Sequence, residues 1–197
     1  IYGMNKNQIV VGNGAAELLY AICRLPGYTG AFVPAPGFSE YKAALEASRI
    51  PVRDIYYRPR EDEHGKPYFE VPYLALETFA AELKGQDGRI IVFLGNPNNP
   101  DGTLLDKNHI RTIASMLKDA NSLLVIDESF IDFVGNDTLQ DNEYSMRSLV
   151  NEFDNIIVVH SFTKFYAVPG LRIGAAFSNP LIIEQLNSFI PTWSVNT

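Results

Sequence analysis

The chain has 197 residues, is 46% hydrophobic and 20% charged, and carries a formal net charge of −7. This size and composition are typical of a globular protein with one substantial core, and the acidic charge argues against nucleic acid or an anionic membrane as the main partner. No apolar run has the length of a membrane span, and the single cysteine excludes an internal disulfide, so we expect a cytoplasmic protein.

Two further features limit what the chain can be. The three histidines, His64, His109 and His160, lack the spacing of metal ligands, so no metal site is predicted. The chain begins at Ile1 rather than Met and ends at Thr197 in the middle of a residue pattern. We therefore expect the sequence to be a fragment of a longer protein.

The first part of the chain predicts alternating strands and helices. A short apolar run at 8–11 ends at Gly12-Asn13-Gly14, and apolar residues then recur at helical spacing over 15–25. The turn leads into a helix N-terminus, where free amides can bind an anion, although a plain helix start is the more common role. A strand at 31–33, a helix at 38–47, a strand at 52–57 and an exposed loop at 58–70 are predicted next.

Phe38 and Tyr41 are three residues apart, on one face of the first turn of a predicted helix. Core packing is the more common use of such a pair. The alternative is an aromatic ring that lies on a flat cofactor.

The middle of the chain places polar residues after two apolar strands. A strand at 89–94 leads into an Asn- and Pro-rich loop at 95–102, which either connects to a helix or fixes an Asn amide at the end of the strand. A strand at 123–126 ends in Asp127, which is either solvated or paired with a cationic ring nitrogen. The other predictions here are a helix at 74–83, an Asp106-capped helix to about 120, a continuation at 130–133, a turn at 135–137 and a weaker helix at 145–153.

The stretch 155–177 holds a buried strand, then a turn with Ser161, Thr163 and Lys164, then a second apolar run that contains Arg172. This arrangement suits a lysine that forms a Schiff base with pyridoxal 5′-phosphate, with hydroxyls and Arg172 around the phosphate. The S-x-x-K pattern of serine β-lactamases also fits Ser161 to Lys164, but its partner motifs do not occur and Pro169-Gly170 argues against the helix it needs. A solvated lysine in a plain turn is the third interpretation.

Strands alternate with helices, and a final helix is predicted at 180–189. This order predicts an α/β fold, a three-layer αβα arrangement with a mainly parallel mixed sheet. The side chains of Asn99, Asp127, Ser161 and Lys164 all follow the carboxyl ends of strands, where ligands of such sheets bind.

These motifs in order resemble the fold-type I enzymes that use pyridoxal phosphate, specifically the class I/II aminotransferase group. The motifs are GNGAAE at 12–17, PGFSEY at 36–41, NPNNPDG at 96–102, DESFIDF at 127–133, SFTK at 161–164 and GLRIG at 170–174. Within the group the sequence looks most like threonine-phosphate decarboxylases, which act in cobalamin biosynthesis, and like histidinol-phosphate aminotransferases.

The resemblance implies a role for each motif residue. Lys164 is the Schiff-base lysine, Asp127 pairs with the ring nitrogen, Asn99 bonds the 3′ oxygen and Phe38 stacks on the ring. The residues implied to hold the phosphate are Ala15 and Ala16 through their amides, Ser161, Thr163 and Arg172. The aminotransferase pattern has a tyrosine where this sequence has Phe130, and this departure favours the decarboxylase.

The resemblance also implies a large cofactor-binding domain over 1–189 and, at 190–197, the start of a connection to a small C-terminal domain. It implies a homodimer, in which an N-terminal arm contributes to the partner's site. A non-catalytic domain that senses pyridoxal phosphate and a scaffold without cofactor are the other functional classes left open.

Overall fold

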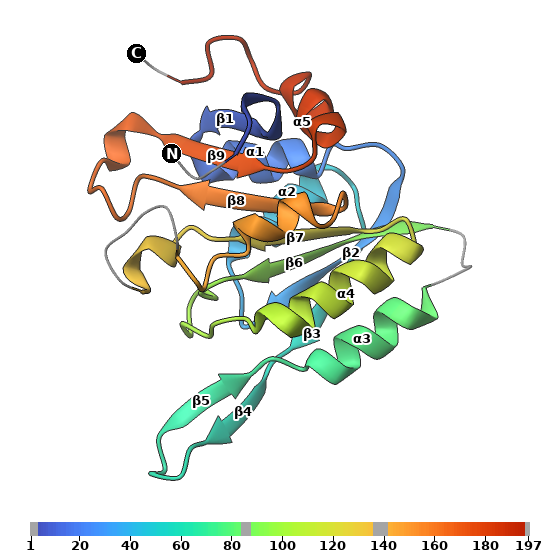
Figure 1. The fold of residues 1–197 in the computed structure, drawn as a ribbon, viewed down its shortest axis with the longest axis vertical. Coiled ribbons are helices and arrows are strands. Elements are labelled where there is room, and N and C mark those ends of the chain that lie inside the picture. The colour runs from blue at the N-terminus through green and yellow to red at the C-terminus, as the bar shows by residue number, and fades with distance from the viewer. Residues whose placement is uncertain (1–3, 84–87, 136–141, 196–197) are drawn as a thin grey trace.

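The computed structural model describes residues 4–83, 88–135 and 142–195. In these residues seven strands form one sheet with the order β1-β9-β8-β7-β6-β2-β3 (Figure 1). Strands β3, β2, β6, β7 and β8 run parallel, β9 is antiparallel to β8, and β1 is antiparallel to β9. The prediction of a mainly parallel mixed sheet is confirmed. The strands are β1 (Ile9–Asn13), β2 (Tyr28–Ala35), β3 (Val52–Tyr56), β6 (Arg89–Gly95), β7 (Leu123–Asp127), β8 (Ile156–Ser161) and β9 (Ile173–Phe177).

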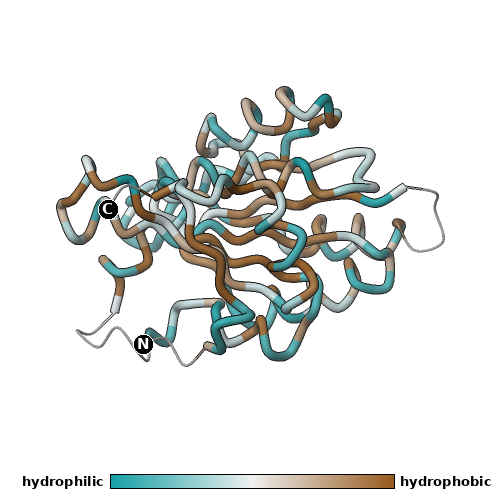
Figure 2. The backbone as a smooth tube through the Cα atoms, turned by 90° about the horizontal axis from the view of Figure 1, so that it is seen from above, coloured by the Kyte–Doolittle hydropathy of each residue, from teal (hydrophilic) through white to brown (hydrophobic). Residues whose placement is uncertain are grey.

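Helices cover both faces of the sheet, because alternate residues of the central strands point to opposite sides. In β6, Ile91 and Phe93 pack toward one set of helices, and Val92 and Leu94 toward the other. The sheet therefore forms the apolar middle layer of the molecule (Figure 2). One side holds α1 (Gly14–Ile22), α2 (Ser39–Ala47) and α5 (Pro180–Asn187), and the other holds α3 (Tyr73–Glu82) and α4 (Lys107–Asp119).

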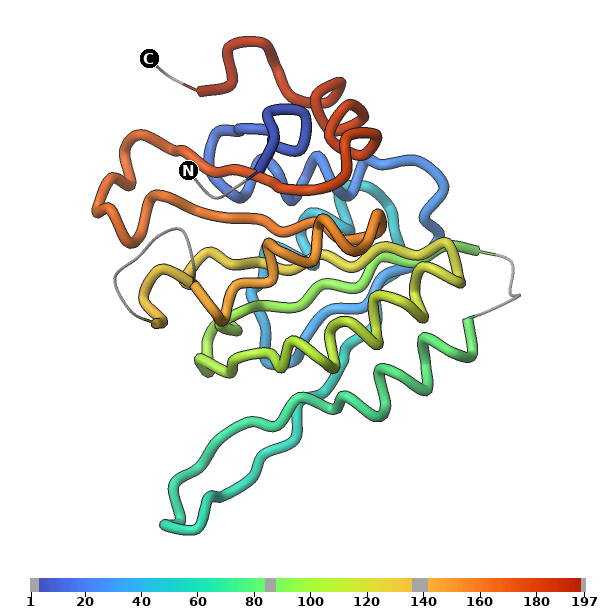
Figure 3. Tube along the Cα trace, viewed as in Figure 1, coloured from blue at the N-terminus to red at the C-terminus, as the bar shows by residue number. Residues whose placement is uncertain are grey.

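The stretch 58–70 is exposed as predicted, but it is not a loop: it forms a β-hairpin of β4 (Arg58–Glu61) and β5 (Pro67–Glu70). The Asp62 carboxylate accepts hydrogen bonds from the amides of His64 and Lys66, and so closes the turn. Both strands are edge strands, where proline is tolerated, so the prolines did not exclude them. The hairpin projects from the body of the molecule (Figure 3).

Two other expectations change in detail. The helix predicted at 145–153 is a 3-10 helix, Arg147–Asn151, and the segment predicted at 130–133 continues as a 3-10 turn, Ile131–Phe133. Positions 136 and 137 of the predicted turn lie outside the described residues. Across the part of the chain that the structure describes, no helix is long and apolar enough to cross a membrane.

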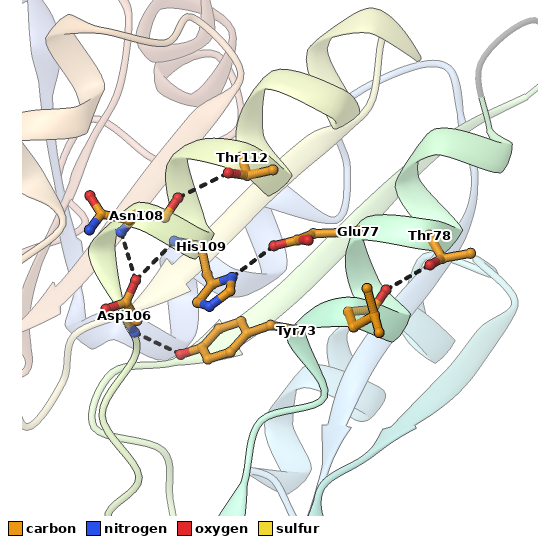
Figure 4. A network of polar contacts seen from close by, with 8 residues as sticks. Tyr73, Glu77, Thr78, Asp106, Asn108, His109 and Thr112 are labelled. Atoms are coloured by element: carbon orange, nitrogen blue, oxygen red, sulfur yellow. Dashed lines mark hydrogen bonds and ion pairs between the residues drawn. The ribbon is translucent and has the colours of Figure 1, made fainter.

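A polar cluster joins α3 to the start of α4 (Figure 4). The Tyr73 hydroxyl accepts a hydrogen bond from the Asp106 amide at 2.7 Å, and its ring stacks on His109 with centroids 4.3 Å apart. His109 Nδ1 lies 2.8 Å from Glu77 Oε1. The Asp106 carboxylate accepts from the amides of Asn108 and His109, which confirms the predicted N-cap.

Candidate active site

A pocket lies at the carboxyl ends of the parallel strands, the edge where the sequence predicts a site. It brings together four of the predicted residues: Phe38 precedes α2, Asn99 follows β6, Asp127 ends β7, and Lys164 follows β8. The pocket therefore assembles residues that are far apart in the sequence. The remaining lining residues are Tyr41, Pro97, Ser129 and Phe130.

Two donors hold the carboxylate of Asp127. The side chain is 6% exposed. Oδ1 accepts a hydrogen bond from the Ser129 amide at 2.9 Å, and Oδ2 accepts one from the Tyr41 hydroxyl at 2.9 Å. Each carboxylate oxygen can accept more than one hydrogen bond, so Asp127 keeps capacity for a donor inside the pocket.

Lys164 places its amine beside Phe130. The Nζ atom lies 4.5 Å from the centroid of the Phe130 ring. Partial desolvation lowers the pKa of Lys164, Arg172 lowers it further, and the nearby Asp127 acts in the opposite direction. Because the neutral amine is the nucleophilic form, a lowered pKa favours attack of Lys164 on a carbonyl carbon at neutral pH.

The N-terminus of α1 lies next to the Arg172 guanidinium, and Arg172 in turn is near Lys164. Gly14 has a φ of 78°, and a Cβ built there would lie 2.7 Å from Arg172 Nη2. A Cβ on Gly174 would lie 2.6 Å from the amide nitrogen of Ala15. The two glycines thus allow Arg172 and β9 to lie close to the start of the helix, where the Ala15 amide is. Free amides and a guanidinium together form an anion site.

The two predicted hydroxyl residues are buried next to this anion site. Ser161 Oγ and Thr163 Oγ1 are 2.8 Å apart and share a hydrogen bond. Ser161 is opposite Gly174 in the β8–β9 register, and Gly174 contacts Ala15. Because Ser161 is the last residue of a strand and is not on a helix, the S-x-x-K interpretation is not supported.

Sequence reasoning did not identify the interactions behind the pocket. The Tyr41–Asp127 hydrogen bond joins residues 86 positions apart, and only the i, i+3 spacing of Tyr41 and Phe38 drew attention to that side chain. Glu128 is fully buried, and its carboxylate accepts hydrogen bonds from Ser145 Oγ at 2.6 Å and the Met146 amide at 2.5 Å. Burial raises the pKa of Glu128.

The donor set of this site fits pyridoxal 5′-phosphate. The α1 amides and Arg172 suit a phosphate, the amine of Lys164 suits an aldehyde, and the buried Asp127 carboxylate suits a protonated ring nitrogen. Phe38 supplies an aromatic ring and Asn99 an amide in the same pocket. Four of the predicted residues, Phe38, Asn99, Asp127 and Lys164, therefore line one pocket.

Comparisons with known proteins identify the family of the chain. Residues 2–197 match the family model described as aminotransferase class I and II. The chain is 35% identical to the adenosylcobalamin biosynthesis bifunctional protein CobDQ of Leptospira interrogans. This match covers 100% of this chain and 21% of that protein. It is 29% identical to histidinol-phosphate aminotransferase 1 of Trichormus variabilis, and this match covers 94% of this chain and 46% of that protein.

The fold also matches a solved structure. The crystal structure of L-threonine-O-3-phosphate decarboxylase from Porphyromonas gingivalis superposes with a TM-score of 0.73 at 24% identity, over 100% of this chain and 52% of that one. The chain therefore spans from a fifth to about half of the proteins it resembles. On the match to the family model over nearly its whole length, the chain belongs to the aminotransferase class I and II family.

Proposed function

We propose that this chain is the cofactor-binding part of a pyridoxal phosphate enzyme that acts on a phosphorylated amino compound. The observation that carries the proposal is the shared pocket of Lys164, Asp127, Asn99 and Phe38. A lysine amine, a buried carboxylate, an amide and an aromatic ring around one space are the groups this cofactor requires.

One group of residues is assigned to the phosphate of the cofactor. The amides of Ala15 and Ala16 and the Arg172 guanidinium would hold the phosphate, together with the Ser161 and Thr163 hydroxyls. Helix N-terminal amides favour an anion, and arginine binds phosphate through two hydrogen bonds at once.

The residues in the pocket control the chemistry. Pyridoxal phosphate, when bound, supplies an electron sink that stabilises negative charge at the substrate Cα. The Asp127 carboxylate would accept the N–H of the ring nitrogen, and Asn99 would donate to the 3′ oxygen. Lys164 would hold the cofactor through Nζ, and its amine could also hold or return a proton at Cα.

We propose decarboxylation of threonine phosphate as the reaction. Two observations support it. The 35%-identical relative is named for adenosylcobalamin biosynthesis, the pathway of the threonine-phosphate decarboxylases that the motifs resemble. Phe130 lines the pocket beside Lys164 and offers no hydroxyl, where the aminotransferase pattern has a tyrosine. The second candidate is transamination of histidinol phosphate, which the 29%-identical relative favours.

Products distinguish the two reactions. The full-length natural protein is given threonine phosphate alone, or histidinol phosphate with 2-oxoglutarate, after loading with pyridoxal phosphate. Release of CO₂ from threonine phosphate supports the decarboxylase, and formation of glutamate supports the aminotransferase. Neither product from a loaded protein contradicts both.

We further propose that residues 1–189 form the large domain, that 190–197 begin a connection, and that the whole protein is a cytoplasmic homodimer. The described residues 190–195 hold no helix or strand, which supports the boundary. The family resemblance supports the dimer. A monomer mass from light scattering of the full-length protein contradicts it.

A further inference from the structure

Tyr41 lines the pocket next to Asp127, and the proposed function assigns it no role. Its side chain is 1% exposed, and its hydroxyl donates to Asp127 Oδ2 at 2.9 Å. Its ring is fixed on both sides: it stacks on Phe93 with centroids 5.3 Å apart, and meets Phe38 edge-on at 5.7 Å. The phenol therefore has one orientation, and this orientation points its hydroxyl at Asp127.

The phenol cannot act as an acid or base in this position. Burial raises the pKa of Tyr41 well above its ordinary value, and the neighbouring Asp127 carboxylate raises it further. A raised pKa keeps the hydroxyl protonated at neutral pH, so it remains a donor to the carboxylate. A buried charged acceptor with a fixed donor is held more firmly than one without.

The hydrogen bonds to Asp127 define which way its carboxylate faces. The Ser129 amide, from the same chain segment, donates to Oδ1. The Tyr41 hydroxyl, from α2, donates to Oδ2. Lys164 is the nearby cation, and its attraction would draw the carboxylate toward the lysine amine. The hydrogen bond from Tyr41 on α2 restrains rotation of the carboxylate.

Resting on the proposed function, we infer that Tyr41 is a positioning residue that orients the Asp127 carboxylate toward the ring nitrogen of pyridoxal phosphate. Phe38 connects the two roles, because the same ring that lines the cofactor pocket packs against Tyr41. Two residues at the N-terminus of α2 would therefore act on the cofactor: Phe38 on the face of the ring, and Tyr41 on the ring nitrogen through Asp127.

The test compares two cofactors that differ only at the ring nitrogen. Affinities of the full-length natural protein are measured by equilibrium dialysis for pyridoxal phosphate and for its carbocyclic analogue, in which C–H replaces the nitrogen. The variants are Tyr41→Phe, which keeps the ring and removes the hydroxyl, and Tyr57→Phe as the matched control. Tyr57 is 4% exposed, packs on the opposite face of the sheet, and its hydroxyl has no hydrogen-bond partner within the described residues.

The inference predicts that Tyr41→Phe weakens pyridoxal phosphate binding about tenfold, as expected for one hydrogen bond to a charged group. Binding of the analogue should be unchanged, and Tyr57→Phe should change neither affinity. In an Asp127→Asn background, Tyr41→Phe should have no additional effect.

Three results would decide against it. If Tyr41→Phe weakens the binding of both cofactors equally, Tyr41 has only a structural role. If it weakens the binding of neither, Tyr41 has no role in cofactor binding. Both results overturn the inference and leave the proposed function intact. If the wild-type protein binds neither cofactor, the proposed function fails and the inference fails with it.

Discussion

The substitution Gly174→Ala tests the anion site through its backbone. A Cβ at this position would lie 2.6 Å from the Ala15 amide nitrogen and 2.7 Å from the Gly14 carbonyl carbon. Ordinary contact begins at 3.4 Å, so the start of α1 must move away from β9 by about 0.8 Å. The contacted atoms are backbone, which cannot rotate away as a side chain can. Overpacking of this kind costs about 1–3 kcal/mol of unfolding free energy.

The same movement should weaken cofactor binding. A displacement of that size takes an amide-to-phosphate hydrogen bond outside its normal range, and losing one charge-assisted bond costs about 1.5–3 kcal/mol, or roughly 10- to 150-fold in affinity. Gly170→Ala is the matched control, because a Cβ there meets nothing within 4 Å. Urea unfolding and a pyridoxal phosphate titration are measured for both variants. If Gly174→Ala behaves like Gly170→Ala in both assays, the proposed packing of α1 on β9 is wrong.

The other predictions concern individual ionisable and polar groups. Arg172→Gln should raise the pKa of Lys164, since a neighbouring cation is removed; the pH dependence of Lys164 acylation, followed by mass spectrometry, should shift to higher pH, and an unshifted profile refutes the coupling. The pKa of Glu128 is raised above its ordinary value of 4.5, so its contribution to stability is complete below pH 4.5 and lost as pH rises through the raised pKa. Urea unfolding should show the wild-type free energy falling relative to Glu128→Gln over that window, and parallel curves would contradict it. Tyr73→Phe removes the acceptor of the Asp106 amide and should cost about 0.5–1.5 kcal/mol in thermal unfolding, whereas an unchanged midpoint would show that the contact contributes nothing.

The sequence predicts the sheet and the residues at its edge better than it predicts the contacts behind them. Asp127 and Lys164 follow buried apolar strands, and in a parallel sheet such strand ends must lie near one another. No local pattern links Tyr41 to Asp127, because that contact depends on how α2 packs against the sheet. The same limit applies to Glu128, which looks like a second strand-end carboxylate but points into the interior.

The two segments that were predicted wrongly have physical explanations. Residues 58–70 lack an apolar face, so their pairing depends on the Asp62 turn and on cross-strand contacts such as the Arg60–Glu70 ion pair at 2.8 Å. The helix predicted at 145–153 begins only at Arg147, directly after the residues whose Ser145 hydroxyl and Met146 amide donate to the Glu128 carboxylate. Both outcomes are set by polar groups that periodicity does not detect.

Covalent attachment of the cofactor to Lys164 is the most direct test of the proposed site. The full-length natural protein is incubated with pyridoxal phosphate, reduced with borohydride, digested, and mapped by mass spectrometry, with Lys164→Ala as the control. The account predicts a phosphopyridoxyl group on the peptide that contains Lys164, and none at that position in the variant. Labelling of other lysines with Lys164 unmodified, or no labelling at all, would contradict the account.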